Sequence, residues 1–185
     1  EVEFYLAQIL ETFSTLNNCS QIQKLIDRFE YDRKFYLVQE FIEGTSLEET
    51  LQAEKYLDVD RVILLLQEVL EILKGLHHQG IIYQNIKPSN IIRRSSDRRI
   101  VLTNFGAIED FFDNLTPTKL HSNCSAYAAP EQLVGRPTFS SDIYALGTIA
   151  IQSLTGINPR KLRTRWNFQK IIWQSDLHLD LKLKT

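Results

Sequence analysis

Two short stretches of the 185-residue chain hold the polar side chains most able to do chemistry. The first contains Asn85, Lys87 and Asn90 close together, and the second begins at Asn104. A lysine ammonium can pair with an anion, whereas an asparagine carboxamide is neutral and cannot take a proton at neutral pH. A neutral carbonyl is also a poor ligand for a hard cation such as Mg²⁺, which prefers carboxylate oxygens. Three amides and one cation therefore favour binding over acid–base or metal-assisted chemistry.

The composition is that of an ordinary globular chain, with 43% hydrophobic and 24% charged residues and a net charge of -2. This charge gives no electrostatic reason to expect nucleic acid or an anionic membrane surface as a partner. No signal peptide opens the chain, and no apolar run approaches the ~18 residues of a membrane span. Cys19 and Cys124 form no CxxC pair and indicate free thiols. We therefore expect a cytoplasmic domain.

Hydrophobic periodicity predicts which elements position these residues. In the first part it predicts a helix over residues 2–16, a hairpin from 25–29 and 35–42, and a break at Gly44. A short helix over 47–53 and a long helix over 58–80 follow. Beyond them it predicts short buried strands at 81–82 and 91–92, a second hairpin over 91–103 and a buried helix over 143–154. Residues 109–125 are predicted to form a functional or disordered loop. The fold class is therefore α+β, with a small mixed part, 1–43, and a larger helical part, 44–185.

Five motifs in this order resemble those of eukaryotic-type protein kinases, with wording closest to bacterial Ser/Thr kinases. They are LHHQGIIYQNIKPSN (76–90, the catalytic loop), LTNFG (102–106, the Asp-Phe-Gly motif), YAAPE (127–131, the Ala-Pro-Glu motif), SDIYALG (141–147, the buried helix behind it) and FYLVQEFIEG (35–44, the strand and hinge that hold adenine). The resemblance covers roughly residues 5–160 and implies a two-lobed kinase-like fold. Because the chain starts at the helix before the hinge and stops before the last helices, we expect both lobes to be incomplete.

The resemblance assigns the polar positions their roles, and two of these roles are lost. In the kinase family, the position of Asn85 carries an Asp that orients the substrate hydroxyl proton, and the position of Asn104 carries an Asp that holds Mg²⁺. A positioned general base is worth about 10²–10⁴ in rate. Lys87 matches the lysine that contacts the transferred phosphate, and Asn90 matches the second metal ligand. Both also fit a structural role in the loop. Gln84 replaces the arginine that would receive an activation-loop phosphate.

Adenine contacts are implied at the hinge residues Glu40, Phe41 and Ile42, with Ile92 as the floor of the pocket. Asp142 is expected to hold the catalytic loop from beneath through backbone amides.

The family also implies a column of apolar side chains between the lobes, made here of Leu10, Leu25, Tyr83 and Phe105. Glu131 would normally pair with an arginine in the last helices, so it is either unpaired here or paired with sequence beyond this chain. The histidines at 77 and 78 are expected to be one packed and one exposed residue and not metal ligands.

Three functional hypotheses remain open. The first is a pseudokinase-type binding or regulatory module of a bacterial signalling protein, without efficient phosphoryl transfer. The alternative is a Ser/Thr protein kinase with residual ATP-dependent activity when its full small lobe is present. The third is a remnant held folded by a partner.

No cofactor is expected for this chain. ATP and Mg²⁺ enter only if the full domain is functional, and a metal at Asn90 and Asn104 would be weak or lost. The expected partner is a protein or the remaining domains of a larger chain. Self-association or a longer natural chain is also expected, because the strand over 35–42 leaves an open edge. The basic tail after residue 160 fits either a docking surface or a solvated segment.

Overall fold

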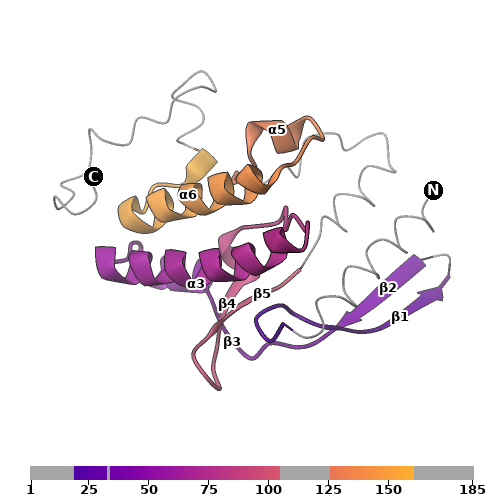
Figure 1. Ribbon diagram of the computed structural model, residues 1–185. Helices are drawn as coiled ribbons and strands as arrows, with labels where there is room; N and C mark the ends of the chain where they lie inside the picture. Colours follow the sequence, from indigo (N-terminus) through magenta and orange to yellow (C-terminus); the bar gives the residue numbers. More distant parts are fainter. Residues whose placement is uncertain (1–18, 33, 105–125, 161–185) are drawn as a thin grey trace.

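The computed structural model describes residues 19–32, 34–104 and 126–160, so the predictions for 2–16, 109–125 and the basic tail lie outside it. In chain order its elements are β1 (Leu25–Tyr31), β2 (Lys34–Gln39), β3 (Gly44–Ser46), α2 (Leu47–Glu54), α3 (Val59–His78), the 3₁₀ turn η1 (Pro88–Asn90), β4 (Ile91–Arg94), β5 (Ile100–Leu102), α5 (Pro130–Leu133) and α6 (Phe139–Thr155). Figure 1 shows α3 and α6 side by side, with β3, β4 and β5 below α3.

Helix α3 forms where the periodicity predicted it. The Asp58 carboxylate accepts a hydrogen bond from the Arg61 N–H at 2.9 Å and so caps the first turn. Gly80, with a φ of +76°, follows the helix in a conformation that glycine adopts readily. The buried positions recur at helical spacing: Val62, Leu65, Val69, Ile72, Leu73 and Leu76. This stripe buries one face of α3 in the core.

Helix α6 begins earlier than predicted, at Phe139. The Thr138 N–H donates to Ser141 Oγ at 3.0 Å, which satisfies a donor at the start of the helix. The helix ends at Thr155 and is capped by Gly156, whose backbone lies in the left-handed region at φ +68°. The prediction of a buried helix over 143–154 holds for Leu146 and Ile149, which are 2% and 0% exposed, but is wrong for Ile143, which is 44% exposed.

Both predicted hairpins are confirmed. Strands β1 and β2 pair antiparallel, and Phe29 stacks on Tyr36 with ring centroids 5.0 Å apart. Strands β4 and β5 belong to a three-stranded antiparallel sheet whose third strand is β3. The predicted break at Gly44 is wrong, because this residue begins β3. A Cβ there would collide with the Arg93 carbonyl oxygen, so only glycine lets β3 lie this close to β4.

A short connection joins the chain before β1 to the edge of β5. The Gln23 N–H donates to the Leu102 carbonyl at 2.9 Å, and the Leu102 N–H donates to the Gln21 carbonyl at 2.9 Å. Ile22, which lies between Gln21 and Gln23, forms a parallel bridge with Leu102 and is 2% exposed. This pairing places Gln23 next to the end of β5, where Asn104 follows.

The prediction of a strand at residues 81–82 is wrong. The Ile81 N–H returns to the Leu76 carbonyl at the end of α3, at 3.0 Å. The Tyr83 N–H donates to a side chain, Asp142 Oδ2, at 2.9 Å. Since these donors are already used, the segment has no strand ladder.

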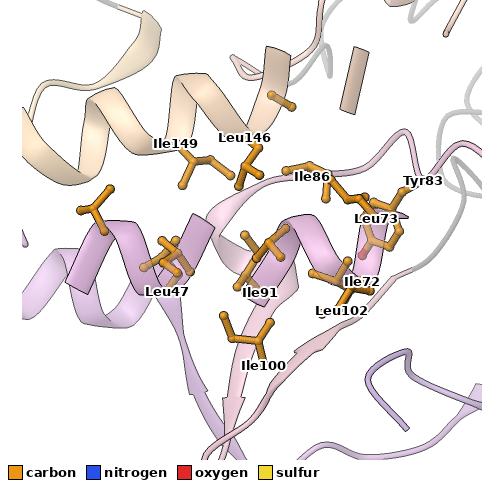
Figure 2. Close-up of a cluster of buried hydrophobic side chains, with 14 of the residues drawn as sticks. Leu47, Ile72, Leu73, Tyr83, Ile86, Ile91, Ile100, Leu102, Leu146 and Ile149 are labelled. Atoms are coloured by element: carbon orange, nitrogen blue, oxygen red, sulfur yellow. The ribbon is translucent and has the colours of Figure 1, made fainter. Parts of the chain in front are cut away.

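The core lies between α3, α6 and the three-stranded sheet (Figure 2), and it includes Leu73, Ile91, Ile100 and Leu146. Burying each such side chain contributes about 1.5–3 kcal/mol. Of the predicted apolar column, Tyr83 is in this core, Leu25 packs against it, and positions 10 and 105 lie outside the described residues. Among the helices of the described ranges, none is long and apolar enough to cross a bilayer.

Candidate functional site

The loop that carries Asn85 is held from below by the buried carboxylate of Asp142, as the sequence predicted. Asp142 is 1% exposed. Its Oδ2 accepts from the Tyr83 N–H at 2.9 Å and its Oδ1 accepts from the Gln84 N–H at 2.8 Å. His77 Nε2 lies 2.9 Å from Oδ2 and donates to it, because a carboxylate can only accept. These donors fix the loop to α3 and α6 at one point.

Tyr83 links this loop to the end of β5. Its side chain is fully buried, and its hydroxyl donates to the Thr103 carbonyl. Burial, together with the nearby Asp142 charge, raises the pKa of the Tyr83 hydroxyl far above its usual value. Tyr83 is therefore a neutral donor at every relevant pH and keeps the chain before Asn104 in register with the loop.

The three asparagines form a closed ring of hydrogen bonds. Asn85 Nδ2 donates to the Asn104 carbonyl at 2.9 Å. Asn104 Nδ2 donates to Asn90 Oδ1 at 3.1 Å, and Asn90 Nδ2 donates to the Asn85 carbonyl at 2.9 Å. We call this set the asparagine ring. It joins residues that are distant in sequence without any charged group.

The donors and acceptors of the ring leave one orientation for each amide. The Asn85 carbonyl can only accept, so Asn90 must turn Nδ2 towards it and Oδ1 away. That Oδ1 can in turn only accept, so Asn104 must present its Nδ2. Asn90 is 1% exposed, which makes a lost partner costly. The amide oxygen of Asn90 is therefore engaged by Asn104.

Asn104 of the ring and Gln84, the residue before Asn85, have left-handed backbone, at φ +55° and φ +64°. Asparagine tolerates this region, whereas glutamine adopts it less readily. At Gln84 both backbone groups are fixed: the N–H by Asp142 and the carbonyl by the side chain of Gln132 on α5. Such positions cost about 1–3 kcal/mol and persist where their surroundings over-determine them.

The predicted hinge is linked to Asn104 through the side chain of Gln23. Ile42 is buried at 7% exposure and Phe41 is 88% exposed, so the Phe41 side chain projects into solvent. The Glu40 N–H donates to the Lys24 carbonyl at 2.9 Å. The Glu40 carbonyl accepts from Gln23 Nε2 at 2.7 Å. Sequence reasoning missed Gln23, which lies in no motif.

The comparisons with known proteins agree with this arrangement. The sequence matches the protein kinase domain family over residues 7–184. The chain belongs to the protein kinase family. The two-lobed α+β fold class and the resemblance to bacterial Ser/Thr kinases are therefore confirmed.

Similar kinases include several from cyanobacteria. The chain is 34% identical over 185 residues to serine/threonine-protein kinase B of Synechocystis sp., covering 93% of this chain and 32% of that protein. It is 37% identical to serine/threonine-protein kinase D of the same organism, covering 91% and 34% of the two chains. It is 36% identical to serine/threonine-protein kinase PknA of Nostoc sp., covering 90% and 30%. The chain thus spans about a third of the length of these relatives.

The kinase family implies a magnesium ion at Asn90 and Asn104, and these residues fit it poorly. Hard divalent cations prefer carboxylate oxygens, and the asparagine ring contains none. Its one buried amide oxygen, Asn90 Oδ1, already accepts from Asn104 Nδ2. Within the described ranges, no group of three or more His, Cys, Asp and Glu side chains is placed to hold a metal. The donor set is that of a structural cluster.

The remaining predicted kinase positions are placed as follows. Lys87 directly precedes η1, and its carbonyl accepts from the Asn90 N–H at 2.9 Å. Ile92 is half-buried on β4, opposite Ser46 of β3 and Val101 of β5. These contacts fit the structural role proposed for the loop, while contacts to phosphate or adenine stay predictions.

Glu131 has a partner that sequence reasoning did not foresee. Its carboxylate accepts from Ser141 Oγ at 2.6 Å, and this hydrogen bond lowers the pKa of Glu131. The expectation of an unpaired carboxylate is therefore wrong, while a pairing with an arginine beyond this chain stays a prediction. Ser141 lies next to Asp142, so this bond ties α5 to the start of α6.

A separate pocket of about 440 Å³ lies between α2, α3 and the three-stranded sheet. Leu65 and Ile100 line its apolar wall, and the ion pair of Arg93 with Glu68, 3.1 Å apart, lies on its polar wall. No residue of the asparagine ring or of the predicted hinge lines it. This pocket is therefore not the candidate site, which consists of the asparagine ring and the hinge residue Glu40 that Gln23 links to it.

Proposed function

We propose that this chain is a pseudokinase-type binding or regulatory module without efficient phosphoryl transfer. The observation that carries the proposal is the asparagine ring: the two positions that hold acidic groups in the kinase family carry amides. The Asn85 amide donates to the Asn104 backbone carbonyl, and the Asn104 amide donates to the Asn90 side chain. Transfer depends mainly on positioning and charge neutralisation. The ring supplies positioning without charge.

The loss at position 85 affects a different step from the loss at position 104. Asn85 uses its Nδ2 to hold the Asn104 carbonyl and cannot accept the proton of an attacking hydroxyl. Asn104 offers no charge to a metal. Either loss alone slows transfer strongly, and together they remove the features by which a kinase activates its nucleophile and neutralises phosphate.

A kinase with residual activity is the second candidate, and Lys87 favours it. This lysine directly precedes η1, on the loop that carries Asn85 and Asn90, and gives that loop a positive charge. A point charge of this kind can orient a phosphate. It cannot replace the base.

The partner we propose is a protein, or further domains of a longer bacterial signalling protein. The resemblance to bacterial kinases and the short span of this chain on its relatives support this proposal.

A restoration series tests the proposed function. We expect no detectable phosphoryl transfer to a generic hydroxyl-containing protein by the natural full-length protein. Asn85→Asp and Asn104→Asp are each expected to add little. The double substitution is expected to raise transfer by at least about 10²-fold, because a positioned base is worth that much once a metal site is also present. Transfer by the unmodified protein as strong as by the double variant would overturn the proposal.

A further inference from the structure

The side chain of Gln23 links the hinge to Asn104. Its Nε2 donates to the Glu40 carbonyl at 2.7 Å, and its Oε1 accepts from the Asn104 N–H at 3.0 Å. Its own backbone is fixed, since the Gln23 N–H donates to the Leu102 carbonyl at 2.9 Å. One carboxamide thus satisfies an acceptor on the hinge and a donor just after β5.

These two contacts define which chemical groups can bind to the Glu40 carbonyl and the Asn104 N–H. The Glu40 carbonyl requires a donor, and the Asn104 N–H requires an acceptor beside it. A primary carboxamide presents this pair on one planar edge. An aminoheterocycle such as adenine, with an amino group next to a ring nitrogen, presents the same pair.

We propose that Gln23 is the built-in partner of the Glu40 carbonyl and the Asn104 N–H and determines which ligands these two groups accept. The ligand class is an uncharged, planar molecule with a donor and an acceptor side by side, bound without metal when Gln23 is absent or withdrawn. This inference rests on the proposed function, because it takes Glu40 and Asn104 to belong to the nucleotide site of a chain that does not use Mg²⁺.

A ligand that binds here replaces the hydrogen bonds of Gln23 and adds none. In the unmodified chain a ligand must break both Gln23 bonds to make two equivalent ones, so its net gain from hydrogen bonding is close to zero. Without the carboxamide, the Glu40 carbonyl and the Asn104 N–H lack this partner, and a ligand that supplies both contacts gains what the protein has lost. Gln23 therefore lowers ligand affinity by competition.

The test measures adenosine binding by calorimetry in the natural full-length protein and its variants. Gln23→Ala removes the carboxamide and opens its space. Gln21→Ala is the matched control, because Gln21 is the same residue type nearby and its Nε2 donates to the Ile100 carbonyl at 3.2 Å, on β5. Gln23→Leu fills the space without hydrogen bonds. If Gln23→Ala does not fold, Gln23→Ser replaces it.

We expect Gln23→Ala to bind adenosine at least about tenfold more tightly than the unmodified protein, as two freed hydrogen-bonding groups allow. Gln21→Ala and Gln23→Leu are expected to remain at the unmodified affinity, and Mg²⁺ is expected to change none of these values. Equal affinity in Gln23→Ala and Gln21→Ala, or tight binding of adenosine by the unmodified protein, overturns the inference. Either of these results leaves the proposed function standing, whereas transfer by the unmodified protein overturns the function and not the adenosine result.

Discussion

Replacing Asp142 with alanine is expected to lower the free energy of unfolding by about 3–5 kcal/mol, the cost of breaking a buried charged hydrogen-bond cluster. The substitution leaves the Tyr83 N–H, the Gln84 N–H and His77 without their acceptor at a buried position. A domain of this kind has about 5–15 kcal/mol in total, so the loss is a large part of it. Urea unfolding followed by circular dichroism measures the change.

Two further variants show whether the loss comes from these hydrogen bonds. Asp142→Asn keeps one acceptor oxygen and is expected to give an intermediate loss that is measurable even if the alanine variant does not fold. Asp97→Asn removes an exposed carboxylate whose hydrogen bond with Arg94 lowers the pKa of Asp97 to about 2. It is expected to change stability far less. A loss below about 1 kcal/mol for Asp142→Ala would show that this carboxylate does not anchor the loop.

Replacing Asn104 with aspartate is expected to make stability depend on magnesium. The change sets a carboxylate oxygen against Asn90 Oδ1, where the donor now lies at 3.1 Å. Two acceptors then face each other, and turning Asn90 only moves the conflict to the Asn85 carbonyl. Without metal we expect a loss of about 1–3 kcal/mol, the cost of a buried group without its partner. Added Mg²⁺ is expected to recover this loss by binding both oxygens.

The control for this variant is Asn158→Asp. Asn158 Oδ1 accepts from the Arg160 N–H at 2.9 Å, a contact that a carboxylate keeps. The same chemical change is therefore expected to have little effect on stability there, and none that Mg²⁺ alters. An Asn104→Asp variant as stable as the unmodified chain without metal would mean that the asparagine ring contributes little.

The fold was largely predictable because its elements carry strong local signals. The Asp58 cap and the stop at Gly80 fall where the pattern placed them, and the α3 stripe does so except at Leu70, which is 41% exposed. The two hairpins were likewise predicted correctly. The errors at residues 81–82 and at Gly44 have different causes. The Ile81 N–H returns to the Leu76 carbonyl at the end of α3, whereas at Gly44 the close approach of the distant residue Arg93 decides the backbone conformation. A local pattern contains no information on such contacts.

The site was only partly predictable for the same reason. The motifs located all three asparagines and the anchoring role of Asp142, because these positions have fixed spacings in the kinase family. They did not indicate that the three asparagines form a ring of hydrogen bonds, or that Gln23 reaches both Glu40 and Asn104. Gln23 lies between β1 and Ile22, the residue that forms a bridge with Leu102. Only the folded arrangement therefore brings its side chain to Glu40 and Asn104.

The central claim is that an uncharged ring of amides stands where a kinase holds its metal and base. A thermal-shift titration of the natural full-length protein with ATP, with and without Mg²⁺, tests it most directly. Asn104→Asp with Mg²⁺ serves as the comparison in which a metal effect is expected. The account predicts no stabilisation of the unmodified protein at micromolar ATP and no change when Mg²⁺ is added, because Asn104 and Asn90 are bonded to each other. A clear, magnesium-dependent stabilisation of the unmodified protein at micromolar ATP would contradict it.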